Sequence, residues 1–263
     1  MATNMPIIVP LQRANHGNHF RAYGLRGAAA LIDPFINVDH AWMSAPTFPP
    51  HPHAGLSAVS YVFLDSETGI RNRDSLGSRN LIRPGGLHWA TAGSGIVHEE
   101  VPAEPGKTVH SLQIFVGLPR ERQDIAPSVL SLEPQDIPLL QLPGAKVRVS
   151  LGWFGEARSP LRPPTEVTML DISLEPGATL QVPVAAGEAA FAMPIFGMTK
   201  VDGQTFEHDD LMVPVYQAKE VPSVITLKAF RGGTKAVFFA GCPLHSAATG
   251  KHMQVAHPGR FTS

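Results

Sequence analysis

The sequence predicts an all-β protein made of two small β-barrels in tandem. Its 24 glycines and 25 prolines fall at short intervals between apolar runs, a pattern typical of many short strands joined by tight turns. Both halves of the chain show this organisation, and closing each set of strands into a barrel removes exposed sheet edges. We therefore expect a first barrel over residues 1–130 and a second over residues 131–263, which also include a C-terminal tail.

The first half is expected to form most of its barrel from five strands, at residues 19–24, 29–38, 58–64, 87–92 and 109–118. Residues 58–64 are rich in β-branched and aromatic side chains, which favours an inner strand. The proline-rich residues 45–52 predict a loop. Polar residues and a glycine predict a hairpin over 65–74, and Arg-Pro-Gly-Gly predicts a turn at 83–86.

Residues 119–138 are interpreted as a linker. The charged residues 120–124 favour a helical turn, but Pro127 and Pro134 exclude a long helix. Strands then resume at residues 145–151, 167–174, 179–184, 189–196, 211–216, 224–229 and 236–240. The Arg231-Gly232-Gly233 segment is predicted to be a turn, because it lacks the spacing of a phosphate-binding loop.

Composition and charge narrow the class of protein. Hydrophobic residues make up 43% of the 263 residues and charged residues 16%, which is enough for a buried core. The net charge of -1 argues against direct nucleic-acid binding. Cys242 is the single cysteine, so no intrachain disulfide is possible. The first 13 residues do not resemble a signal peptide, and polar residues and prolines interrupt the apolar stretch 178–198. We expect a cytoplasmic protein without a membrane span.

Two short motifs in the first half carry the chemistry. Side chains two apart on a strand share a face, so His51 and His53 point the same way, and so do His98 and Glu100. If the two strands lie side by side, three imidazoles and one carboxylate converge. Such a nitrogen and oxygen set suits a divalent first-row metal with positions left open for other ligands. Glu99 then points away from the metal.

The same motifs resemble those of the pirins, a branch of the cupin superfamily. The resemblance is sharp in Asp33-Pro34-Phe35, in residues 48–55 (FPPHPHAG) and above all in residues 84–100 (PGGLHWATAGSGIVHEE), and weaker agreement covers most of the chain. It implies a fold of two cupin barrels with one divalent metal, in the N-terminal barrel only. Iron(II) is the expected metal, and manganese, cobalt, nickel or copper are compatible. The implied ligands are His51, His53, His98 and Glu100.

One segment departs from the family. Pirins generally follow the histidine pair with Arg-Gly-Phe-Glu, whereas this chain has Ala54, Gly55, Leu56 and Ser57. We expect positions 54 and 57 to surround the metal ligands, where the missing charged side chains would have oriented them. The fold and the metal would survive this change, whereas substrate choice and activity would be altered.

Two classes of function follow from the resemblance. The first is a dioxygenase similar to quercetin 2,3-dioxygenase, acting with O₂ on quercetin or a related flavonol or aromatic. Here Glu100 would be the catalytic base that accepts the substrate hydroxyl proton. The alternative is a non-enzymatic, metal-sensing regulator that binds a transcription factor or a metabolic enzyme. The changed residues after the histidine pair favour a changed substrate or none, and the near-neutral charge offers no partner surface.

Other residues receive more ordinary interpretations. His88 is expected to form a pocket wall, with a role as a fifth ligand as the alternative, and His40 to border the pocket or cap a strand. Gln113 is expected to face the cavity, and Cys242 to be inert. The second half has no paired ligands and is expected to be metal-free. The remaining histidines are interpreted as surface or packing residues, and they are His16, His19, His110, His208, His245, His252 and His257.

Overall fold

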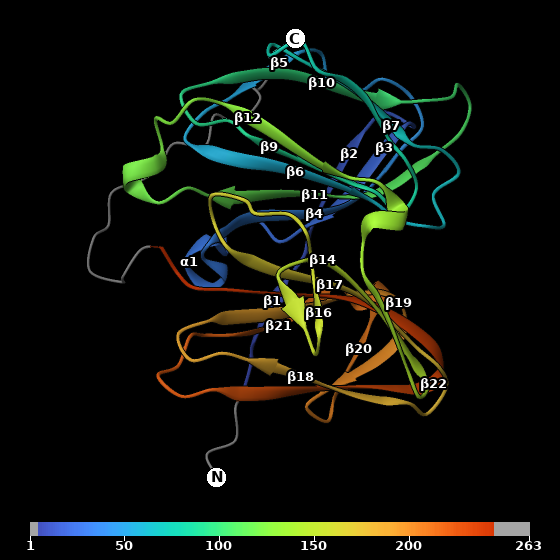
Figure 1. Cartoon of the computed structure of the whole chain (residues 1–263). Helices are drawn as coiled ribbons and strands as arrows, with labels where there is room; N and C mark the ends of the chain where they lie inside the picture. The colour runs from blue at the N-terminus through green and yellow to red at the C-terminus, as the bar shows by residue number, and fades with distance from the viewer. Residues whose placement is uncertain (1–4, 245–263) are drawn as a thin grey trace.

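The computed structural model describes residues 5–244. His245, His252, His257 and the predicted C-terminal tail lie outside the described residues. Two groups of strands are stacked one on the other, with the first half of the chain above the second in Figure 1. The all-β prediction and the two tandem barrels are confirmed.

A seven-stranded sheet and a four-stranded sheet form the first barrel. The larger has the order β12-β9-β6-β11-β4-β3-β2 and the smaller the order β5-β10-β7-β8. Their strands are β2 (Gln12–His16), β3 (Phe20–Gly24), β4 (Phe35–Met43), β5 (His51–His53), β6 (Leu56–Val62), β7 (Ile70–Asp74), β8 (Arg79–Ile82), β9 (Leu87–Thr91), β10 (Ile96–Pro102), β11 (Val109–Gly117) and β12 (Ser128–Leu132).

One nine-stranded sheet forms the second barrel by folding over on itself. Its strands are β1 (Ile7–Pro10), β13 (Leu139–Leu142), β14 (Ala145–Leu151), β17 (Val167–Leu174), β18 (Thr179–Val184), β19 (Ala189–Val201), β20 (Gln204–Glu207), β21 (Met212–Tyr216) and β22 (Ser223–Gly241). A separate hairpin pairs β15 (Trp153–Phe154) with β16 (Ala157–Arg158). The short helices are α1 (Ala29–Ile32), η1 (Arg120–Arg122), η2 (Pro134–Asp136) and η3 (His208–Asp210). None of the helices among residues 5–244 is long and apolar enough to span a membrane.

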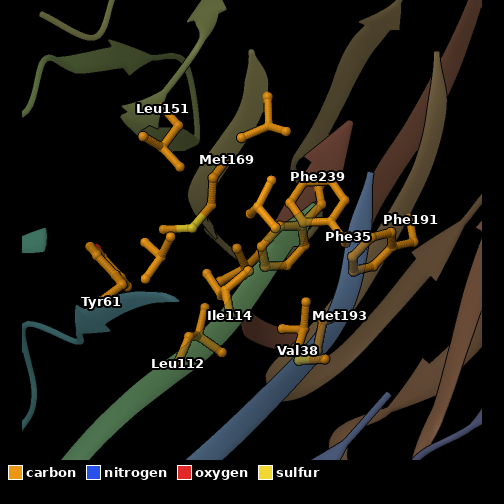
Figure 2. Close-up of a cluster of buried hydrophobic side chains, with 14 of the residues drawn as sticks. Phe35, Val38, Tyr61, Leu112, Ile114, Leu151, Met169, Phe191, Met193 and Phe239 are labelled. Carbon is orange, nitrogen blue, oxygen red and sulfur yellow. The ribbon is translucent and has the colours of Figure 1, made fainter. Parts of the chain in front are cut away.

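The largest core lies between the two barrels. The odd-numbered residues of β6, among them Val59 and Tyr61, face away from the first barrel and pack with Met169 and Phe239 of the second. Figure 2 shows Tyr61 from the first half close to Met169 and Phe239 from the second, within one cluster. This shared core makes the packing of the first barrel dependent on the second.

The interior of the second barrel is filled by apolar side chains. Twenty buried residues form its cluster, including Val147, Leu170, Leu227 and Phe238. By contrast, the apolar clusters inside the first barrel are small, one of four residues and one of three buried residues. The remaining space in the first barrel is therefore available to polar side chains.

Three predicted elements were wrong. The hairpin predicted over residues 65–74 is a loop followed by β7, which pairs with β8 and β10. Residues 29–38 were predicted to be one strand, but they form α1, then the Asp33-Pro34 corner and the start of β4. Alanines at 28–30 favour a helix, and a proline ends it. Residues 231–233 were predicted to be a turn, but they lie within β22. Gly232 has φ +74°, and β22 bends there against Gly197 of β19. A Cβ at Gly197 would lie 2.6 Å from the Gly233 carbonyl oxygen.

Two strands belong to a different sheet from the one that their position in the sequence predicts. β1, at the N-terminus, pairs with β21 in the sheet of the second barrel. β12 lies within the predicted linker and pairs with β9 of the first barrel. The predicted helical turn in the linker is confirmed as η1. The division of the chain at residue 130 stays a prediction.

Candidate metal centre

Antiparallel pairing of β5 with β10 brings the two histidine motifs together. His98 lies directly opposite His51, and Ile96 lies opposite His53. Residues 96 and 98 share a face of β10, so all three imidazoles project from one side of the small sheet. Residues 51–53 form only a three-residue strand, and the proline-rich segment before them delivers the chain to its edge position, where Pro52 is tolerated.

The three histidines form a compact cluster. Their nearest ring nitrogens all lie within 4.8 Å of one another, and the Nε2 atoms of His53 and His98 are 3.1 Å apart. Nδ1 of His51 is 2.9 Å from the Pro49 carbonyl oxygen. A carbonyl can only accept, so this Nδ1 carries the hydrogen and Nε2 keeps a lone pair. Among the residues that the structure describes, this is the one group of three or more ligand-type side chains so arranged.

The electrostatic environment keeps the rings of His53 and His98 neutral. Burial, followed by the neighbouring rings of His98 and His51, lowers the pKa of His53 from 6.5 to about 3. Burial and His51 lower the pKa of His98 to about 4, against a smaller opposing effect of Asp74. Nδ1 of His98 is buried without a hydrogen-bond partner. Neutral imidazoles with free lone pairs are the donors that a divalent metal needs, so the triad fits such an ion.

Glu100 lies beside the triad but outside it. Its two carboxylate oxygens are 2.9 and 2.7 Å from the Ser60 hydroxyl, which donates to them. Burial raises the pKa of Glu100, while charge effects from His88 and the Ser60 hydrogen bond oppose the rise. A raised pKa makes a carboxylate a stronger proton acceptor. Its assignment as the fourth ligand and as a catalytic base stays a prediction.

Strand alternation places Glu99 as expected, but it places Ser57 on the opposite face from the one expected. Glu99 points away from the triad and forms an ion pair of 2.6 Å with Arg73. Ser57 was expected to surround the ligands, but it lies on the same face of β6 as Val59, toward the core between the barrels. This expectation was wrong, because Ser60 and not Ser57 has the parity that faces Glu100 and the interior of the first barrel.

The polar lining of the site was only partly predicted. Gln113 was expected to face the cavity, and its Oε1 is 3.0 Å from the Ser60 hydroxyl. Ser60 itself was missed, although it is the central polar residue in the otherwise apolar stretch 58–64. His88 is buried on the same side as Ser60, and burial lowers its pKa, against an opposing effect of Glu100.

His40 and His110 form a second contact pair, away from the triad. His40 was expected to border the pocket or cap a strand, but it lies in the middle of β4 on the face toward the second barrel. Its Nε2 is 2.7 Å from Nε2 of His110, whose Nδ1 is 3.0 Å from an Asp65 oxygen. The interpretation of His110 as a packing residue is confirmed, because its ring also packs against Phe63. Cys242 is an exposed residue. Partial burial of its thiol and nearby glutamates nevertheless raise the thiol pKa, which agrees with an inert thiol.

The sequence is similar to that of curated pirin relatives. The family model described as Pirin matches residues 18–116. A pirin-like protein of Caulobacter vibrioides is 34% identical over 76% of this chain and 74% of its own length. Pirin-like protein 2 of Arabidopsis thaliana is 34% identical over 71% of this chain, and the match spans only 57% of the plant protein. A Pseudomonas aeruginosa protein named provisionally as a quercetin 2,3-dioxygenase is 29% identical over 81% of this chain and 77% of its own.

Solved structures share the fold. The structure of GK1651 from Geobacillus kaustophilus covers 93% of this chain and 98% of its own, with a TM-score of 0.83 and 26% identity. The structure of a quercetin 2,3-dioxygenase from Acinetobacter baumannii covers 95% of this chain and 91% of its own, with a TM-score of 0.81 and 24% identity. Sequence relatives and fold lead to the same conclusion: the chain belongs to the pirin family, with two tandem cupin barrels.

Proposed function

We propose that the protein is a metal-dependent dioxygenase of pirin type that acts with O₂ on quercetin or a related flavonol. The observation that carries this proposal is the cluster of three imidazoles with a buried carboxylate next to it. A sequence relative named provisionally as a quercetin 2,3-dioxygenase supports the substrate class. Iron(II) is the proposed metal, although the donor set also suits manganese, cobalt, nickel or copper.

His51, His53 and His98 would hold the metal, with Glu100 as the proposed fourth ligand. When bound, the metal would supply Lewis-acid polarisation of a substrate oxygen. Burial keeps the His53 and His98 rings neutral, so their lone pairs would be available to the metal. The pairing of β5 with β10 fixes the spacing of these rings before any ion binds, which lowers the cost of ordering them.

Glu100 would take the proton of the substrate hydroxyl. Burial raises the pKa of this carboxylate, which brings its proton affinity closer to that of an acidic phenol. Ser60 holds the carboxylate by donating its hydroxyl hydrogen, and Gln113 approaches the same hydroxyl. Phe115 lies 5.3 Å from the His53 ring and gives the site an apolar wall. An aromatic substrate with an ionisable hydroxyl suits this combination of base and ring.

The test is oxygen uptake by the iron-loaded protein over a panel of flavonols, with carbon monoxide release as the second readout. We expect consumption of O₂ with quercetin, and loss of that activity in the His98→Ala variant. Turnover no faster than that of free metal ion, across several flavonols and metals, would contradict the proposed activity. The non-enzymatic regulator would then be the next candidate, to be tested by comparing partners captured with apo and metal-loaded protein.

A further inference from the structure

A ring of polar side chains runs around the inside of the first barrel, beside the triad. Ser60 lies opposite His88 across β6 and β9. In the smaller sheet, Asn72 lies opposite both Glu100 and Asn80. The Asn72 amide donates to the Asn80 oxygen at 2.9 Å, and Ser60 donates to Glu100. His88 lies between the Asn72–Asn80 pair and the Ser60–Glu100 pair, next to Asn80 and Ser60. Its side chain is only 2% exposed.

Two neighbours decide which ring nitrogen of His88 carries the hydrogen. Nδ1 is 2.9 Å from the Ser131 hydroxyl oxygen and 3.4 Å from the Asn80 amide nitrogen. Because the Asn80 oxygen already accepts from Asn72, Asn80 presents its NH₂ group, a donor, to His88. Nδ1 therefore accepts, and the hydrogen of the neutral ring resides on Nε2.

Nε2 of His88 is buried and has no hydrogen-bond partner among the described residues. Buried donors are nearly always satisfied in proteins, so an acceptor is expected close by. His88 and Glu100 both lie next to Ser60, since His88 is its partner across β6 and β9 and a Glu100 oxygen is 2.7 Å from its hydroxyl. A carboxylate only accepts, and the single Ser60 hydrogen leaves it room for a second donor.

We propose that His88 is a positioning residue that donates from Nε2 through one ordered water to the Glu100 carboxylate, and so orients that carboxylate toward the metal. The inference rests on the role proposed for Glu100 as a ligand. His88 touches neither metal nor substrate in this account, because it is not part of the histidine triad that could hold the metal. Ser131 and Asn80 would act by holding the ring in the donating tautomer.

Nickel affinity measured by isothermal titration tests the inference, because it needs no turnover. His88→Asn retains an acceptor near the position of Nδ1 but cannot reach Glu100, and we expect it to weaken nickel binding by about 10- to 100-fold. His88→Gln places an amide donor near the position of Nε2 and should bind nickel within about 3-fold of the wild type, a difference that falls below the range of such effects. Thermal unfolding by circular dichroism checks that each variant is folded.

A double-mutant cycle separates action through Glu100 from a general packing effect. We expect the variant with both His88→Asn and Glu100→Gln to bind nickel no more weakly than Glu100→Gln alone. The inference would be overturned if the two losses multiplied, if His88→Asn bound like the wild type, or if His88→Gln were as weak as His88→Asn. If His88→Asn fails to fold, Ser131→Ala replaces it in the same cycle, with the same non-additivity expected. A protein that lacked dioxygenase activity would still give a readable result in these titrations.

Discussion

The two barrels turn different side chains inward. The second barrel is filled with an apolar cluster around Leu227 and Phe238, whereas the first places three histidines and Glu100 beside small apolar clusters. Both interiors are compatible with closed sheets of short strands, so the fold does not decide the chemistry. The comparison teaches that, of two similar barrels within residues 5–244, only the one whose inward positions carry ligand-type side chains offers a candidate metal site.

The first barrel, with its polar interior, depends on packing against the second barrel. The sheet that carries Ser60 on one face packs its other face, including Tyr61, against Met169 of the second barrel. The Tyr61 hydroxyl also donates to Asp171 of β17 at 2.7 Å. The second barrel therefore supplies much of the buried apolar contact that the first barrel, with its polar cavity, cannot supply for itself.

The largest effect is expected from the apolar interior. Phe238→Ala removes a fully buried ring and should lower the free energy of unfolding by about 3–5 kcal/mol, measured by urea denaturation. Phe196 is 63% exposed, so Phe196→Ala should cost about 1 kcal/mol or less. Equal losses in the two variants would mean that the second barrel is not held by its interior.

Removing a histidine of the triad should weaken metal binding by the first barrel. We expect His51→Ala, His53→Ala and His98→Ala each to weaken nickel binding by at least about 100-fold, more than the loss of an outer partner. His208 belongs to η3 of the second half, and His208→Ala should bind nickel like the wild type. Nickel affinity that fell with His208→Ala and stayed with His53→Ala would reverse the assignment of the two barrels.

Adjacent glutamates sharpen the comparison within one strand. Glu100→Gln keeps the size and the carbonyl oxygen of the side chain but cannot accept a proton, so turnover of quercetin should fall by about 100-fold or more. Glu99 faces Arg73, so Glu99→Gln should leave turnover unchanged and alter stability by less than about 1 kcal/mol. A larger loss of turnover in Glu99→Gln would show that β10 has the opposite register.

The smallest effect is expected at the boundary between the barrels. Burial, then His110, lowers the pKa of His40, and burial lowers that of His110 despite Asp65. Both pKa values are lower in the folded than in the unfolded state, so the unfolded state binds more protons below about pH 6.5. Stability should therefore fall as the pH drops through this range, by at most about 1.4 kcal/mol per pH unit for each histidine.

Urea denaturation of metal-free protein at pH 7.5 and 5.5 measures this dependence. A variant with His40→Gln and His110→Gln should lose less stability between the two pH values than the wild type does. An equal loss would attribute the dependence to other groups, such as the histidine triad.

Much of the fold could be predicted because its signals are local. The predicted strands 145–151, 167–174 and 179–184 coincide with β14, β17 and β18, since apolar runs there end at glycine, proline or polar turns. Residues 29–38 failed because alanines carry no strand preference and fit a short helix. β22 was divided in two because glycines predict turns, whereas here they bend a continuous strand.

In the candidate site too, the residues in local motifs could be predicted and those brought together by strand pairing could not. Parity within two short motifs was enough to group His51, His53 and His98, and these three cluster in the structure. The polar residues around them were not accessible to such reasoning. Ser60 and His88 meet because β6 pairs with β9, and that register is set by strand pairing and packing that no local pattern encodes.

Metal stoichiometry tests the central claim most directly. Elemental analysis of protein loaded with excess iron(II) under anaerobic conditions, after removal of unbound metal, should give one metal per chain. The variant with His51→Ala and His53→Ala should give none, while His208→Ala should still give one. Two metals per chain in the wild type, or one metal retained after loss of both motif histidines, would contradict the account of a single site in the first barrel.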